Sequence, residues 1–245
     1  MTATLDQTIR EIVATDFRTA AVFQRYGLDF CCNGRRTVEQ GCREAGADAA
    51  AVLRDLDAVL AAPADGAPAF ASWSAPELVH HIVHTHHAFV REAIPLLLRH
   101  TRKVAEVHGD RHPELIHIAG LFERVAEEMA DHMAKEEQVL FPFVVALADG
   151  KTPSAPFGTV RNPIRMLEAE HQFVGDAMAE MRRLTDGYTL PEDACTTYSV
   201  CFQELESFEA DLHIHVHLEN NVLFPKGRRW KAIFHDAGRH VLTTP

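Results

Sequence analysis

Two eleven-residue segments of this 245-residue chain carry the same arrangement of histidine and glutamate. Residues 132–142 read HMAKEEQVLFP and residues 215–225 read HVHLENNVLFP, so both contain His-x-x-x-Glu-x-x-Val-Leu-Phe-Pro. Residues four apart share one face of a helix, so the histidine and the glutamate of each segment can bind the same ion. One copy alone is usually a solvated helix face, but two copies that match at this many positions predict a metal site.

A further histidine precedes each segment at a matching distance. His87 and His171 both begin the motif His-x-Phe-Val and lie 84 residues apart, close to the 83 residues between His132 and His215. In an antiparallel hairpin, two residues at the same height are centred on the turn. The midpoint of each histidine pair falls at or near a glycine-containing turn signal. Each half of the repeat is therefore predicted to be a helical hairpin with its two histidines at one height.

Four imidazoles and two carboxylates in one layer of a helix bundle are typical of a dinuclear, carboxylate-bridged metal site. Imidazole suits several transition metals and carboxylate suits harder ions, so the mixture favours iron, with manganese as the alternative. Each ion would take two histidines, both glutamates could bridge the ions, and a solvent-derived oxo or hydroxo group would complete the bridge. The predicted ligands are His87, His132, Glu136, His171, His215 and Glu219.

An acidic residue lies four positions before the second histidine of each hairpin. Glu128 precedes His132 and Asp211 precedes His215. Histidines that bind a metal usually donate their other ring N–H to a carboxylate or a carbonyl. Glu128 and Asp211 are therefore candidates to orient the two rings.

The chain has sixteen histidines, and most are expected to lie outside the metal layer. His108 is 21 residues beyond His87, which is about 31 Å along an unbroken helix. It reaches the same ions only if the helix breaks near Pro95. The others are expected to line an access path or to lie at the surface, and His86 and His217 are among those expected at the surface.

The elements that must position these residues are helices, because strand alternation is absent. Four long helical stretches, joined by short loops, predict an antiparallel four-helix bundle in an all-α protein. Capping boxes, in which Ser or Thr is followed three residues later by Glu or Gln, mark four helix starts. The stretches are roughly 75–107, 113–147, 162–185 and 190–224, and the boxes are Thr4–Gln7, Thr37–Gln40, Ser74–Glu77 and Thr189–Glu192.

A composition shift separates the bundle from a smaller helical region. Residues 61–75 are rich in alanine and proline and lack helical periodicity, which indicates a linker. The predicted organisation is a small helical domain (1–62) with Cys31 and Cys32, a linker (63–74), the four-helix bundle (75–225) and a carboxyl-terminal tail (226–245).

Charge and cysteine usage exclude several other classes. The net charge of −11 argues against a nucleic-acid partner or a basic membrane-surface protein. No signal peptide and no apolar run as long as a membrane span are recognised. Five cysteines, two of them adjacent, make no disulfide framework, so the cytoplasm is the expected compartment.

The chain resembles the hemerythrin-like di-iron proteins and, more closely, the repair of iron centres family of bacteria. The double cysteine and the string Leu-Glu-Asn-Asn-Val-Leu-Phe-Pro are the most specific matches, and the likeness runs through nearly the whole chain. The matching residues are Tyr26–Gly34 with Cys31 and Cys32, His87, Glu92, Pro95, His108, His132, Glu136, Glu170, His171, Ala194–Thr197 and His215–Pro225.

The resemblance implies a hemerythrin-like bundle behind a small double-cysteine domain, with Glu170, which precedes the ligand His171, as a third candidate to orient a metal-binding histidine. It also implies a stress-response protein that repairs iron–sulfur clusters damaged by nitric oxide or oxidants, by supplying iron, by handling nitric oxide, or both. Its partners would be damaged iron–sulfur proteins or the cluster-assembly machinery, with nitric oxide or dioxygen as small ligands. The expected oligomeric state is monomer or homodimer.

Two other functions and three roles for the cysteines stay open. The chain could be a hemerythrin-like protein that binds or senses dioxygen or nitric oxide, although those carriers resemble sites with five histidines. It could instead be a nitric oxide reductase-type di-iron enzyme. Cys31 and Cys32 could bind a metal or a cluster fragment, form a disulfide, or react with nitric oxide.

Overall fold

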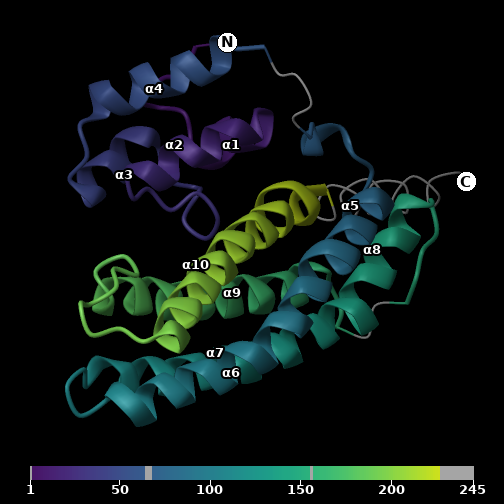
Figure 1. Cartoon of the computed structure of the whole chain (residues 1–245). Helices are drawn as coiled ribbons and strands as arrows, with labels where there is room; N and C mark the ends of the chain where they lie inside the picture. Colours follow the sequence, from purple (N-terminus) through teal and green to yellow (C-terminus); the bar gives the residue numbers. More distant parts are fainter. Residues whose placement is uncertain (1, 64–67, 155–156, 227–245) are drawn as a thin grey trace, which may run out of the picture. The chain divides into compact units, whose positions relative to one another are not determined.

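The computed structural model describes residues 2–63, 68–154 and 157–226, and within these ranges the chain is all-α, as predicted. It contains no strand there beyond an isolated bridge between Thr8 and Thr37 (Figure 1). The described residues form two compact units, with boundaries after Leu78 and after His215. The last long helix therefore begins in the second unit and ends in the first.

The first unit contains four short helices and the end of the last one. Ile9, Phe23, Val52 and Leu56 are almost wholly buried and form its apolar core. Its elements are α1 (Ile9–Thr15), η1 (Phe17–Thr19), α2 (Ala20–Arg25), α3 (Val38–Ala45), α4 (Ala49–Ala61), η2 (Phe70–Ser72) and η5 (Leu218–Leu223).

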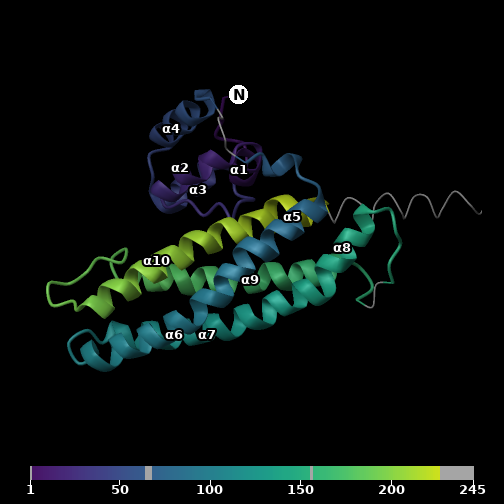
Figure 2. The same ribbon diagram turned by 45° about the vertical axis from the view of Figure 1, so that its right-hand side comes forward.

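Among the described residues, four long helical runs lie alongside one another and make up the second unit, except that the first run begins and the last run ends within the first unit (Figure 2). Helix α6 packs against α7, and α7 packs against α9. Phe122 and Phe208 meet edge to face in the core, with ring centroids 5.5 Å apart. The runs are α5 (Ala75–His81), η3 (Ile82–His87) and α6 (Ala88–His108); α7 (Glu114–Lys135), η4 (Glu136–Leu140) and α8 (Phe141–Ala148); α9 (Arg161–Leu184); and α10 (Thr196–His217), continued by η5.

Three of these runs contain a π-helical segment, and each segment carries a predicted ligand. His87 ends η3, Glu136 begins η4 and Glu219 lies in η5. A π-helical segment holds one extra residue per turn and is often found at functional sites. Pro142 and Pro225 follow η4 and η5 closely; a proline cannot donate the helical hydrogen bond, so the backbone before it is free to take the wider turn.

The capping boxes at Thr37 and Ser74 begin helices as predicted, whereas the predictions at Thr4 and Thr189 are wrong. The carbonyl of Gln7 accepts a hydrogen bond from Val38, so it is not available to a helix, and α1 starts after Thr8 instead. The Thr189 hydroxyl donates back to the carbonyl of Asp186 at 2.7 Å. The last helix consequently begins six residues later than expected, at Thr196.

The predicted domain limits stay predictions. Helix α5 starts at Ala75, where the bundle was expected to begin. Part of the linker, residues 64–67, and all of the tail except Lys226 lie outside the described residues. Among the residues that the structure describes, no helix is both long and apolar enough to span a membrane.

Candidate metal centre

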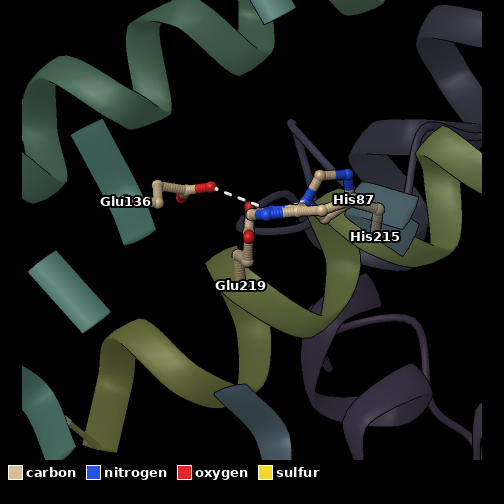
Figure 3. A group of neighbouring side chains, drawn as sticks. All are labelled: His87, Glu136, His215 and Glu219. Atoms are coloured by element: carbon tan, nitrogen blue, oxygen red, sulfur yellow. Dashed lines mark hydrogen bonds and ion pairs between the residues drawn. The ribbon is translucent and has the colours of Figure 1, made fainter. Parts of the chain in front are cut away.

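Four predicted ligands form one buried group. One ligand atom each from His87, Glu136, His215 and Glu219 lies within 4.8 Å of the others (Figure 3). The Glu136 carboxylate faces the His87 ring, with Oε2 and Nε2 3.4 Å apart. Glu219 follows His215 by four residues on one continuous helix, so it shares the face of that histidine. All four side chains have essentially no exposed surface.

The two remaining histidines form a second group with the same glutamates. His132 and His171 join Glu136 and Glu219 under the same 4.8 Å limit. The Nε2 atom of His132 lies 3.3 Å from Oε2 of Glu136. The structure therefore brings all six predicted ligands together as two sets of four, with both glutamates common to the two sets.

The spacing of the ring nitrogens would allow each pair of histidines to bind one ion. The Nε2 atoms are 3.2 Å apart for His87 and His215 and 2.9 Å apart for His132 and His171. Two nitrogens that bind one ion at about 2.1 Å and at right angles are about 3.0 Å apart, whereas a tetrahedral angle requires about 3.4 Å. Imidazole and carboxylate ligands together suit a transition metal ion such as iron or manganese.

Carboxylates orient two of these rings through their Nδ1 atoms. His132 Nδ1 lies 2.9 Å from Glu170, and His87 Nδ1 lies 2.6 Å from Glu137. When Nδ1 donates to a carboxylate, the lone pair of a neutral ring is left on Nε2, which is the atom that faces the other ligands. Glu170 thus contacts His132, on the neighbouring helix, and not the adjacent His171.

Both orienting carboxylates are held in the ionised form that accepts these hydrogen bonds. Burial alone raises the pKa of Glu170, but hydrogen bonds from His132 and Lys135 lower that pKa below its usual value. The pKa of Glu137 is lowered in the same way, because hydrogen bonds from His87 and Arg91 outweigh the effect of burial.

Glu137 is the functional neighbour that the repeat did not reveal. It follows the ligand Glu136 directly, and the second copy has Asn220 at the equivalent position. The adjacent pair of glutamates in the first copy was the available signal.

The other two proposed orienting acids are placed elsewhere, which corrects the prediction. Asp211 accepts a hydrogen bond from His86 at 2.9 Å and not from His215. His86 directly precedes the predicted ligand His87 in the sequence. Glu128 has no hydrogen bond to a predicted ligand among the described residues, since Glu170 from α9 occupies the Nδ1 side of His132.

Two histidines expected at the surface are buried. His86 is 3% exposed and its ring stacks on His215, with centroids 5.6 Å apart. His217 is 1% exposed and lies between Phe17 and Phe30. Histidine spacing alone could not separate these inward positions from outward ones.

His108 lies at the far end of α6 from His87, as its spacing predicts. The helix runs unbroken past Pro95, so the histidine does not approach the metal layer. Its Nε2 lies 3.2 Å from the Sγ of Cys195, and its ring lies against Tyr198 with centroids 5.2 Å apart. All five cysteines are free thiols, including Cys31 and Cys32.

A helical bundle with a buried cluster of histidines and glutamates is typical of helical cation-binding proteins. The chain belongs to the hemerythrin family, whose HHE cation binding domain matches residues 78–227. A second family, described as a domain of unknown function (DUF542), matches residues 5–60. The chain is therefore a two-domain member of the hemerythrin family.

Its relatives share both domains over nearly their whole length. The chain is 33% identical over 221 residues to iron-sulfur cluster repair protein YtfE of Enterobacter sp. (strain 638), covering 90% of this chain and 96% of that protein. It is 31% identical over 223 residues to iron-sulfur cluster repair protein ScdA of Staphylococcus haemolyticus, covering 91% and 98%. A probable iron-sulfur cluster repair protein of Haemophilus influenzae is 30% identical over 221 residues, covering 90% and 96%.

Proposed function

We propose that this protein repairs damaged iron–sulfur clusters by means of a di-iron centre. The observation that carries the proposal is the sharing of Glu136 and Glu219 between two sets of ligands. Each iron would take two histidines, both glutamates would bridge the ions, and an oxo or hydroxo group would complete the bridge. Relatives named for cluster repair that match both domains support the same function.

The residues of this chain have separable roles in such a centre. Glu136 and Glu219 would hold the ions together and neutralise their charge within the apolar bundle. Glu137 and Glu170 would keep the Nδ1 atoms of His87 and His132 protonated. The Nε2 lone pair of each ring would then be directed toward the ions. Bound ferrous ions would supply open coordination positions for nitric oxide or dioxygen.

The supply of iron to a damaged cluster follows from the ligand set. Two nitrogen ligands for each ion should hold iron less tightly than a set richer in histidine, so iron should leave within minutes when a chelator is offered. The clients would be iron–sulfur proteins damaged by nitrosative or oxidative stress, or their assembly machinery. Five free cysteines fit the reducing cytoplasm as the compartment.

Iron analysis of purified variants tests the ligand assignment. We expect His132→Ala and Glu219→Ala to lower the iron content sharply while the helical content stays near that of the wild type. His112→Ala is the matched control, because His112 contacts Asp193 at the far end of the bundle. Unchanged iron in the two ligand variants would contradict the assignment.

Restoration of a damaged cluster enzyme tests the function itself. The iron-loaded protein should restore activity, whereas the iron-free protein and the His132→Ala variant should not. A dioxygen titration of the reduced protein separates the alternative: reversible oxygenation would indicate a carrier, and irreversible oxidation is expected for the repair protein.

A further inference from the structure

Three metal-ligating side chains meet in the first unit, in the loop between α2 and α3. One ligand atom each from Asp29, Cys31 and Cys32 lies within 4.8 Å of the others. The two Sγ atoms are 3.5 Å apart, and Oδ1 of Asp29 is 3.3 Å from Sγ of Cys31. Cys31 is buried and Cys32 is half-buried, so the cluster has one sheltered side and one side open to solvent.

The loop backbone holds this arrangement without a metal. Oδ1 of Asp29 accepts from the backbone N–H groups of Cys31 and Cys32 at 3.0 and 2.9 Å. Its other oxygen accepts from the side chain of Asn33 at 2.7 Å. A Cβ at Gly34 would lie 2.7 Å from the carbonyl oxygen of Phe30, so only glycine fits there.

Two side-chain amides from the end of the last helix fix the same loop. Asn220 donates to the carbonyl of Cys31 at 3.2 Å, and Asn221 donates to the carbonyl of Phe30 at 3.0 Å. These residues belong to the same compact unit as the loop, and Asn220 directly follows Glu219. A site whose ligands are already ordered loses less conformational entropy when it binds an ion.

Two of the distances in the cluster are close to those between the ligands of one tetrahedral ion. Two sulfurs bound at about 2.3 Å with a tetrahedral angle are about 3.8 Å apart, and a sulfur and an oxygen bound at about 2.1 Å are about 3.6 Å apart. The observed separations are shorter by only a few tenths of an ångström. Thiolates select soft and borderline ions, and tetrahedral sulfur sites suit zinc and iron.

We propose that Asp29, Cys31 and Cys32 form a mononuclear site for a borderline divalent cation, Fe²⁺ above all, with a fourth position open to a thiolate or other ligand of a client protein. The site shares no ligand with the bundle centre, but the choice of Fe²⁺ rests on the proposed repair of clusters. Fe²⁺ is the ion that a protein of cluster repair must handle, and an open position is what allows an ion to be passed on.

Binding at this site exchanges protons for the ion and changes no oxidation state. The hydrogen bond with Cys32, burial and the nearby charge of Asp29 all raise the pKa of the Cys31 thiol, so this thiol keeps its proton in the metal-free cluster. One Fe²⁺ replaces the protons of both thiols, two Fe–S bonds form, and two protons pass to solvent. A cation also balances the ionised Asp29, whose pKa is lowered by its hydrogen bonds despite the opposing effect of burial.

Cobalt titration of thiol-reduced protein that has been given only enough iron to fill the bundle centre tests the site. Only thiolate ligands give near-ultraviolet sulfur-to-cobalt charge transfer, so Co²⁺ entering the histidine and glutamate ligands of the bundle is silent at these wavelengths. We expect the band to saturate at one equivalent of Co²⁺ and to accompany the visible bands of tetrahedral cobalt. Fe²⁺ should compete with Co²⁺, and the protein should take up one more iron per chain than the bundle centre holds.

Single substitutions identify the residues that give rise to the sulfur-to-cobalt band. Cys31→Ser and Cys32→Ser should each abolish the band, and Asn33→Ala should weaken cobalt affinity about tenfold, as the loss of a partner of a ligand does. Cys195→Ser is the matched control, since Cys195 is exposed and should leave the band unchanged. Far-ultraviolet circular dichroism shows that each variant is folded, and Cys32→Ser, at a half-buried position, is the safer of the two replacements.

Two results would overturn the proposal. One is a band that persists at full strength in the folded Cys32→Ser protein. The other is the absence of any band in wild-type protein whose thiols are shown by titration to be reduced. In either case the iron content of the bundle centre is measured on the same samples, so the failure of this site is distinguished from failure of the di-iron proposal.

Discussion

One carboxylate on the Nδ1 side orients each of two histidine rings in the candidate metal centre. The Nδ1 partners of His87 and His132 come from different helices, Glu137 from η4 and Glu170 from α9, and the repeat places Asn220 and His86 at the positions equivalent to these two carboxylates. The repeat therefore preserves the ligands and not the groups that orient them. Arg91 and Lys135 pair with these two carboxylates, so each ring is oriented by an ion pair at the rim of the bundle.

Neutralising an orienting carboxylate should weaken metal binding without unfolding the bundle. We expect Glu170→Gln to reduce iron affinity by about tenfold to hundredfold, the usual effect of removing such a partner. Glu128→Gln is the matched control, because Glu128 lies near the same helix segment without a hydrogen bond to a described ligand. Iron retention during dialysis against a graded series of chelator concentrations measures the difference. Equal retention in the two variants would show that Glu170 does not orient His132.

The cysteines should differ widely in reactivity. Burial raises the pKa of Cys201 to about 12, and burial also raises that of Cys42, so both remain protonated at neutral pH. Cys195 is exposed. Iodoacetamide at pH 7.5 should label Cys195 first and leave Cys42 and Cys201 unmodified until the protein is denatured, as followed by mass spectrometry of peptides. Rapid labelling of Cys201 in the folded protein would contradict its burial.

At the scale of the helices, the sequence predicted which residues of a hairpin lie at the same height better than it predicted the local geometry of each helix. The heights of His87 and His132 follow from simple hairpin arithmetic, and the structure brings both into the metal layer. The π-helical segments could not be predicted, because one extra residue in a helical turn leaves no periodic signal. The start of α10 was also missed, since the turn before it uses the Thr189 hydroxyl in a way that a capping pattern does not reveal.

The turn between α6 and α7 sets the height at which the ligands of the first hairpin meet. A Cβ at Gly109 would lie 2.4 Å from the carbonyl oxygen of Ala105 and 3.0 Å from Ile116, so Gly109→Ala must displace backbone. We expect it to lower the free energy of unfolding by about 1–3 kcal/mol, the usual cost of overpacking. Chemical denaturation followed by circular dichroism measures this change.

Gly120→Ala in the next helix provides the opposite control. Nothing lies within 4 Å of a Cβ at this exposed position in α7. Alanine has the better helix propensity, so this variant should raise the free energy of unfolding by about 0.5–1 kcal/mol. If both variants changed stability in the same direction, the close approach at Gly109 would not be the cause.

For the molecule as a whole, the sequence predicted two helical parts and one metal layer, and it left the partners of that layer open. Periodicity and the repeat were sufficient for the all-α fold and for the six candidate ligands. The burial of His86 and His217 was not predicted, because it depends on aromatic rings brought from distant segments, such as Phe17 beside His217. Tertiary contacts of this kind have no signature in local spacing.

Removing iron should destabilise the protein, because a bound ion would link six buried ligands that lie together only in the folded state. Glu136 and Glu219 have no exposed surface, and burying two carboxyl groups costs free energy that binding to an ion offsets. A ligand that binds only the folded state stabilises it by about 2.7 kcal/mol when its free concentration is 100 times its Kd. The iron-loaded protein should therefore melt at a higher temperature than the iron-free protein, and the gain should rise with free iron in anaerobic scans.

The His132→Ala variant should lose most of this dependence, whereas His112→Ala should keep it. A melting temperature that is independent of iron in the wild type would contradict iron binding by these buried ligands.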